Sequence, residues 1–318
     1  MLGFTTRLQS RLLAGSPGLG GRAVDRAPPD SAHHTISRQV PQRGRDRDKA
    51  ARNRDHTGRA NGIIPLMAIS RFEPWEVLSN SADVTEWFAP VLHEAPWGDI
   101  RALVPDMYPQ YVRLLHPAYQ EQPGGKRMVQ WQEIAAYTNH VFHPLVQFPN
   151  LVGLQLQQYE SGINENEGQY GPWTDPPEQG TLPPEIIGSV VDVLRGCTGT
   201  PDNCFFALWS GWADVRKLDI AKAAHLRLPG RDYIVFQGAI DTAKQSAFKW
   251  RFQAMNLWWP ADRNWFLATD IDLESTYIGI DDNGMEALMA HDSLETIATD
   301  PNNGITTSSD SVNPSPAP

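Results

Sequence analysis

Hydrophobic residues gather in short runs separated by polar turns, and most of these runs lie in the second half of the chain. The runs are aromatic or aliphatic and six to ten residues long, which favours β-strands over helices. Those reading CFFALW and NWFLATDI are apolar at successive positions, so both of their faces should be buried. The predicted strands are residues 111–116, 204–209, 231–240 and 264–271.

Helical spacing of apolar residues, three or four apart, marks other segments. The clearest predicted helix covers residues 183–195, where two prolines suit the first turn and Gly196 suits the end. A second covers residues 81–92, with Trp87 and Val91 on one face. The others cover residues 130–138 and 285–297, the last with a break near His291.

The gaps between the hydrophobic runs are too short for helical crossovers, so neighbouring strands should be antiparallel. Residues 256–279 form the centre of the pattern: a strand, a Pro-Ala-Asp-Arg turn, a second strand and an acidic exit loop. The expected fold class is α+β, with a central, mainly antiparallel β-meander that helices cover on one side. Residues 158–182 should form a surface loop, either a variable insertion or a flap over a site.

The two ends of the chain differ from the body. Residues 1–66 hold twelve Lys and Arg against five Asp, with one aromatic residue and no Trp. A segment so poor in large apolar groups cannot offset its ordering entropy, so residues 1–66 and the tail 300–318 are predicted to be disordered. Residues 67–299 should form one globular domain, and the sequence from Met67 resembles a natural start.

The body is acidic, because residues after 66 hold fifteen Lys and Arg against thirty-two Asp and Glu. Nucleic acid is therefore not expected as a partner of the domain, since phosphate binding needs a basic face. No stretch approaches the roughly 20 apolar residues of a membrane span, and no membrane partner is expected. No P-loop or dinucleotide fingerprint is present, and no cofactor is predicted. Cys197 and Cys204 fit reduced thiols in a cytoplasmic protein.

Three acids follow the last predicted strand at alternate positions: Asp270, Asp272 and Glu274. In an extended chain they would point to one side and present three carboxylates together. Such a row suits a Mg²⁺ or Ca²⁺ ion, or the acid and base of a hydrolase. The favoured interpretation is structural, with no metal: the acids cap turns and pair with Arg231 or Arg263.

The Trp residues are the second signal, since all eleven lie in the acidic body. Trp258 and Trp259 are adjacent, so in a strand they would point to opposite faces. One would pack in the core and the other would be a surface anchor, with Arg263 nearby to bind a carboxylate. The alternative is that both simply pack the core.

Histidine and cysteine offer weaker signals. His140 and His143 have H-x-x-H spacing, but Pro144 argues against the helix that a zinc motif of this kind needs. His116, at a strand end, is either a general base or a hydrogen-bonded, half-buried side chain. Cys204 begins a strand and would need a neighbouring histidine to act as a nucleophile.

Several blocks of the body resemble, in the same order, a group of uncharacterised proteins common in actinobacteria. The blocks are YVRLLHP from Tyr111, CFFALWSGW from Cys204, LPGRDY from Leu228, LWWPADRNW from Leu257 and ATDIDLESTYIG from Ala268. The resemblance covers residues 70–297 and implies a bacterial, cytoplasmic, single-domain protein. It supplies no activity and no catalytic residue.

The sequence thus predicts a non-catalytic binding domain whose partner is a protein or a small molecule. The alternative is a small hydrolase or metal-dependent enzyme that uses the acidic row with a histidine. The expected binding face is aromatic and acidic and consists of Trp258, Trp259, Arg263, Asp270, Asp272 and Glu274.

Overall fold

The computed structural model describes residues 74–154, 173–217, 222–249 and 251–313. All of these segments belong to one compact unit of the chain. The predicted disorder of residues 1–66 and the first part of the predicted loop, 158–172, lie outside the described residues.

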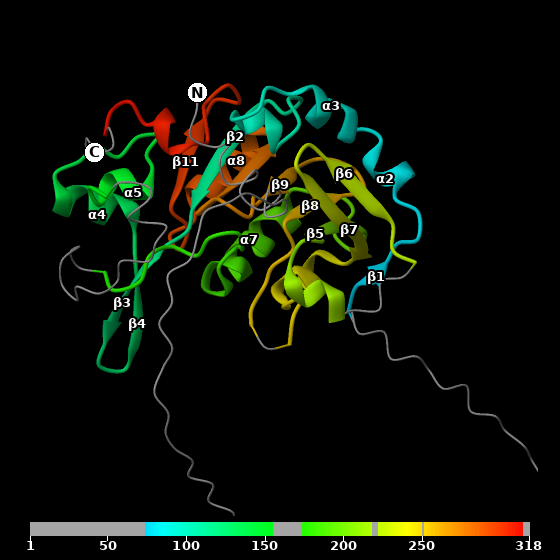
Figure 1. Ribbon diagram of the computed structural model, residues 1–318, viewed down its shortest axis with the longest axis horizontal. Helices are drawn as coiled ribbons and strands as arrows, with labels where there is room; N and C mark the ends of the chain where they lie inside the picture. Colours follow the sequence, from blue (N-terminus) through cyan, green and yellow to red (C-terminus); the bar gives the residue numbers. More distant parts are fainter. Residues whose placement is uncertain (1–73, 155–172, 218–221, 250, 314–318) are drawn as a thin grey trace, which may run out of the picture. The chain divides into compact units, whose positions relative to one another are not determined.

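A large antiparallel sheet forms the centre of the described body (Figure 1). Its strands are β1 (Glu76–Val77), β2 (Gln110–Leu115), β5 (Cys204–Trp209), β6 (His225–Leu228), β7 (Arg231–Gly238), β8 (Leu257–Pro260), β9 (Phe266–Ala268), β10 (Ser275–Ile280) and β11 (Thr296–Thr299). The order is β1-β7-β5-β8-β9-β10-β2-β11, with β6 also paired to β7.

The α+β class and the mainly antiparallel sheet are confirmed. The predicted meander holds for β6–β7 and for β8–β9–β10, where strands adjacent in sequence are paired. It fails between them, because β5 lies between β7 and β8. The simple up-and-down order is therefore wrong for the middle of the sheet.

Helices cover both faces of the sheet, not one face as predicted. Helices α7 (Pro184–Gly196), η3 (Ile240–Lys244) and α8 (Asp282–Met289) contribute to the core on one face, together with Phe206 and Trp258. Helices α2 (Ala82–Thr85), α3 (Ala89–Glu94) and η1 (Ile100–Ala102) contribute to the core on the other face, together with Phe205 and Trp259. Strands that are apolar on both sides require this double cover.

A smaller core lies under helices α4 (Trp131–Thr138) and α5 (Phe148–Leu151), beside the hairpin of β3 (Ala118–Gln122) and β4 (Gly125–Val129). The N-terminus of α4 is capped from a distance: both carboxylate oxygens of Glu295 accept backbone N–H groups, of Trp131 at 2.6 Å and of Gln132 at 2.7 Å. Two short 3-10 turns complete the elements, η2 (Ala213–Lys217) and η4 (Thr307–Ser309).

Two predicted helices differ from the structure. The helix over residues 81–92 is split into α2 and α3, because Pro90 suits a first turn but not a helix interior. Its buried apolar residues are Phe88 and Leu92, while Val91 is 37% exposed, so the predicted apolar face was wrong. The helix over residues 285–297 ends at Met289, and its last part is strand β11, paired with β2.

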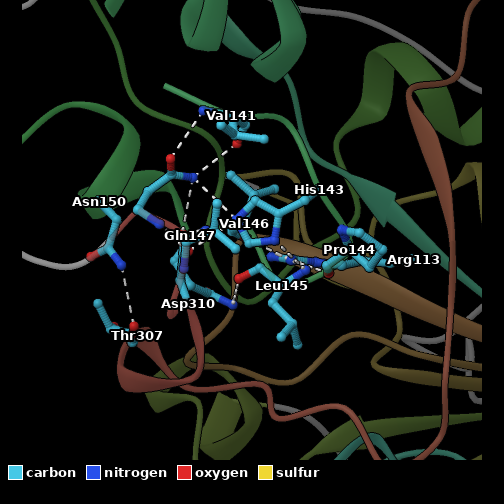
Figure 2. Close-up of polar contacts among 12 residues, drawn as sticks. Arg113, Val141, His143, Pro144, Leu145, Val146, Gln147, Asn150, Thr307 and Asp310 are labelled. Atoms are coloured by element: carbon cyan, nitrogen blue, oxygen red, sulfur yellow. Dashed lines mark hydrogen bonds and ion pairs between the residues drawn. The ribbon is translucent and has the colours of Figure 1, made fainter. Parts of the chain in front are cut away.

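The predicted disorder of the tail is wrong for residues 300–313. Residues 307–313 pack against the 141–150 segment (Figure 2), and residues 301–305 form backbone hydrogen bonds with the 98–101 segment. The Asp310 side chain accepts the backbone N–H of Gln147 (3.1 Å) and lies 3.0 Å from His143 Nε2. Asn313 accepts the N–H of Val141 and donates to its carbonyl oxygen. Asp310 and Asn313 are both buried, so polar bonds hold a segment that composition alone predicts to be disordered.

None of the helices in the described part of the chain is long and apolar enough to cross a bilayer.

Candidate functional site

The acidic row is a turn, not the extended chain that was predicted. After β9 the N–H of Leu273 donates to the carbonyl of Asp270 (3.1 Å), and the N–H of Asp272 donates to the Asp270 carboxylate (3.0 Å). The alternation that would align three carboxylates is therefore lost. Glu274 is half-buried, and its carbonyl accepts the N–H of His116.

Arg231, at the start of β7, forms ion pairs with two of these acids. Its guanidinium donates to both oxygens of Asp270, at 3.1 and 3.2 Å, and to Asp272 at 2.6 Å. The favoured structural pairing with Arg231 is present. Across the described residues there is no group of three or more His, Cys, Asp or Glu side chains placed to hold a metal ion.

Trp258 and Trp259 point to opposite faces of β8, as their adjacency predicts, but neither is a surface anchor. Trp258 is 0% and Trp259 is 1% exposed, because each face of the sheet is covered by helices. Arg263 lies in the turn before β9, at the opposite end of that strand from Asp270, and its guanidinium stacks over Trp87 (5.2 Å). The six residues predicted as one binding face are therefore not brought together.

His116 is fully buried and hydrogen-bonded at both nitrogens. Its Nδ1 lies 2.6 Å from the carbonyl oxygen of Glu178, so Nδ1 is the donor, and Nε2 accepts from the hydroxyl of Thr276 at 2.9 Å. Burial lowers the pKa of His116 to about 4, and the nearby Arg113 adds to the fall. A neutral imidazole closed off from solvent suits a structural role.

The other reactive groups are also held within the fold. His143 bonds Asp310, and His140 Nδ1 is buried without a hydrogen-bond partner among the described residues; the H-x-x-H pair belongs to no group of three or more possible metal ligands there. Burial raises the pKa of the Cys204 thiol to about 12 and also raises that of Cys197. Both cysteines are free thiols, and neither is activated as a nucleophile.

A different group of side chains reaches the surface at the end of β5. Trp209 and Trp212 are half-buried and meet edge to face, with ring centroids 5.2 Å apart. The exposed Arg251 stacks over Trp212 (4.7 Å) and over Phe248 (5.0 Å). We call these four residues the aromatic face; Phe248 is its buried member, and the other three reach the surface.

The aromatic face is fixed in place by its neighbours. The Arg251 guanidinium donates to Asp214 (3.3 Å) and to the side-chain oxygen of Gln253 (2.9 Å). These two bonds hold the guanidinium over the rings of Trp212 and Phe248. A side chain on Gly211 would enter the Trp209 ring, so glycine is needed where the chain turns beneath it. Trp212 Nε1 is buried and lacks a hydrogen-bond partner within the described segments.

Buried amides behind the aromatic face join it to the rest of the sheet. The side-chain oxygen of Asn256 accepts the N–H of Trp209 (3.0 Å), and its amide group donates to the carbonyl oxygens of Gly180 and Thr269. Gln253 also donates to the carbonyl of Gly180 (3.2 Å). The end of the sheet is therefore a rigid platform, closed by the loop that contains Gly180.

No family model, curated protein or solved structure matches this chain. The assignment of a site therefore depends on the geometry of the chain itself, and the resemblance to actinobacterial proteins stays an expectation.

The sequence contained a partial signal for the aromatic face. The W-S-G-W spacing places two tryptophans around a glycine directly after a strand, where a chain leaves a sheet. Arg251 and Phe248 lie far along the chain and carry no local pattern that connects them to Trp212. Only the packing of residues 246–249 and 251–253 against the end of β5 brings them together.

Proposed function

We propose that the folded body is a non-catalytic binding domain that engages a partner protein through the aromatic face. The observation that carries this proposal is the half-buried pair Trp209 and Trp212, which meet edge to face, with the exposed Arg251 stacked over Trp212. Tryptophan and arginine are the residue types that most often dominate the energy of protein interfaces. Because Asp214 and Gln253 already hold the guanidinium, little side-chain entropy is lost on binding.

The state of the other candidate groups supports binding over catalysis. Arg231 forms ion pairs with Asp270 and Asp272, His116 is buried in the interior, and the thiol of Cys204 has a raised pKa. A hydrolase or metal-dependent enzyme built on the acidic row would need these carboxylates to converge, whereas they lie in a turn.

The proposal includes a cytoplasmic setting, which two free thiols support. It names a protein as the partner, in preference to nucleic acid or a membrane, because the body is acidic and the aromatic face offers one cation beside apolar rings.

Quantitative capture from cytoplasmic extract of the source cell tests the proposal. The wild-type chain should retain a partner that Trp209→Ala and Arg251→Ala lose, because truncating a hot-spot residue costs about 2 kcal/mol of binding, or roughly thirty-fold in Kd. Tyr137→Ala is the matched control, since this aromatic side chain is 66% exposed and lies on α4, away from the aromatic face.

Each variant is first checked for an unchanged melting temperature, so that loss of binding is not loss of fold. If the wild-type chain and all three variants retain a partner equally, the binding surface lies elsewhere on the chain. Turnover of a substrate that depends on Asp270 or Asp272 would replace the proposal with the enzyme alternative.

A further inference from the structure

A shallow groove of about 450 Å³ lies along the outer side of β6. Residues that lead into and form α2 make one wall, and the strand makes the other. The lining residues are Ser79, Asn80, Ser81, Ala82, Thr85, Ala224, His225, Leu226 and Arg227. We call this the β6 groove; it shares no residue with the aromatic face.

The backbone of β6 presents free pairing groups to this groove. The N–H of Ser210 donates to the carbonyl of Asp232, so the backbone of Asp232 faces β5 and not β6. In the antiparallel register, Arg227 is opposite Asp232 and His225 is opposite Ile234. The N–H and C=O groups of His225 and Arg227 therefore point away from β7, into the groove.

Of these four backbone groups, the carbonyl of Arg227 accepts a bond from His93 Nε2 at 2.9 Å. The other three, both N–H groups and the carbonyl of His225, form no hydrogen bond to any residue that the structure describes. An edge with unpaired donors and an acceptor is a template for a further strand.

Side chains add more donors on the opposite wall. Asn80 uses its side-chain oxygen to accept the N–H of Ala82 (3.1 Å), which leaves its amide nitrogen to donate. Ser81 caps no helix N–H with its hydroxyl. The guanidinium of Arg227 is exposed at the edge of the groove and makes no ion pair within the described segments.

Charge identifies the occupant. No Asp or Glu lines the groove, although the body as a whole holds more than twice as many acids as bases. Arg227 supplies a permanent positive charge beside several N–H and O–H donors, and together they match carboxylates. The alternation of exposed His225 and Arg227 with buried Leu226 matches an extended segment whose side chains also alternate.

We propose that the β6 groove binds an extended, acidic segment of a partner protein, which adds to the sheet as a strand paired with β6. The backbone of the segment pairs with both backbone groups of His225 and with the N–H of Arg227, whose carbonyl His93 already occupies. Its acidic side chains contact the Arg227 guanidinium, Asn80 and Ser81. This inference is independent of the proposed role of the aromatic face.

Fluorescence anisotropy with a labelled peptide of about eight residues that alternates Val with Glu tests the inference. We expect saturable binding to the full chain and a Kd at least about tenfold weaker for Arg227→Glu. Lys249→Glu makes the same charge change at an exposed residue outside the groove and should change the Kd less than about twofold. Melting temperatures check that both variants fold.

Two further measurements separate strand addition from simple charge attraction. A peptide with N-methyl groups on alternate amides keeps its charge but cannot pair, so it should bind at least about tenfold more weakly. Hydrogen exchange at His225 and Arg227 should slow when the unmodified peptide is bound. Equal binding of the methylated peptide, or unchanged exchange, overturns strand addition. Absence of binding overturns the site, and His225 and Arg227 then serve only to protect the sheet edge.

Discussion

At the scale of single residues, the burial of Trp258 and Trp259 comes from elements that lie far from them in the sequence. The opposite directions of Trp258 and Trp259 follow from the two-residue period of a strand, which every extended backbone shares. Whether each ring is covered depends on Phe88 and Leu92 on one face and on α7 on the other, all distant in sequence. The same holds for Asp270, whose partner Arg231 precedes it by 39 positions.

The acids of the β9–β10 turn differ in burial and should differ in their effect on stability. The side chain of Asp270 is 11% exposed and that of Asp272 is 56% exposed. Asp270→Ala leaves a largely buried guanidinium with one exposed partner and should cost about 1–3 kcal/mol of unfolding free energy. Asp272→Ala removes an exposed ion pair and should cost less than about 1 kcal/mol. Urea unfolding of both variants measures the difference.

The same two variants test for a metal. Because Arg231 already pairs with both carboxylates, millimolar Mg²⁺, Mn²⁺ or Ca²⁺ should leave the melting temperature of the wild-type chain unchanged. A ligand that binds only the folded state would raise it by mass action. A rise that disappears in Asp272→Ala would contradict the structural interpretation and make the metal-dependent enzyme the leading alternative.

At the scale of elements, the sequence was most informative where a hydrophobic run has clear ends. Strand β5 has the predicted bounds, and α7 is displaced from its prediction by one residue at each end. The first half of strand β11 was predicted as the end of a helix, because Thr296–Thr299 has no clear alternation of hydrophobic and polar residues. Its state is set by pairing with β2, a contact that no local pattern contains.

The loop that closes the platform behind the aromatic face depends on one glycine. Gly180 has φ +78°, and a Cβ there would lie 2.8 Å from the carbonyl oxygen of Ile271. Gly153 has a similar φ of +67°, but a Cβ would meet nothing within 4 Å. Gly153→Ala should therefore cost only the backbone strain, about 1 kcal/mol, and Gly180→Ala should cost about 2 kcal/mol or more.

Urea unfolding of the two alanine variants provides this comparison. Equal losses of unfolding free energy would mean that the loop moves away from Ile271 at little cost, and that it does not hold the platform. A larger loss in Gly180→Ala should be accompanied by a change in the fluorescence of Trp209, whose N–H bonds Asn256, the residue that donates to the carbonyl of Gly180.

At the scale of the whole molecule, the sheet is tied together by polar contacts between segments far apart in sequence. The tail meets the 141–150 segment through Asp310, and Glu295 caps α4. Composition predicted the tail as disordered because these contacts are individual hydrogen bonds between residues far apart in the sequence. Such bonds produce no periodic pattern of apolar residues. Two titratable groups, the buried His116 and the half-buried Glu295, make the stability of the molecule depend on pH in opposite directions.

His116 has a folded pKa of about 4, below its ordinary value of 6.5, so the unfolded chain binds the extra proton between these pH values. Its contribution to stability is complete above pH 6.5 and is lost as the pH falls toward 4, by about 3 kcal/mol in total. Burial raises the pKa of Glu295 to about 7, although the N–H groups of Gln132 and Trp131 oppose the rise. The contribution of Glu295 is therefore lost as the pH rises from its ordinary value of 4.5 toward 7.

Unfolding free energies measured at several pH values between 4 and 7.5 should separate the two groups. Without His116, in His116→Gln, stability should fall less on acidification than in the wild-type chain. Without the titrating carboxyl, in Glu295→Gln, stability should fall less as the pH rises toward 7. Because each variant is compared with the wild-type slope and not with its absolute stability, a general loss from the substitution does not affect the result. Parallel slopes for the wild-type chain and His116→Gln would mean that His116 is protonated inside the fold, and that its Nε2 donates to Thr276 where we assign an acceptor.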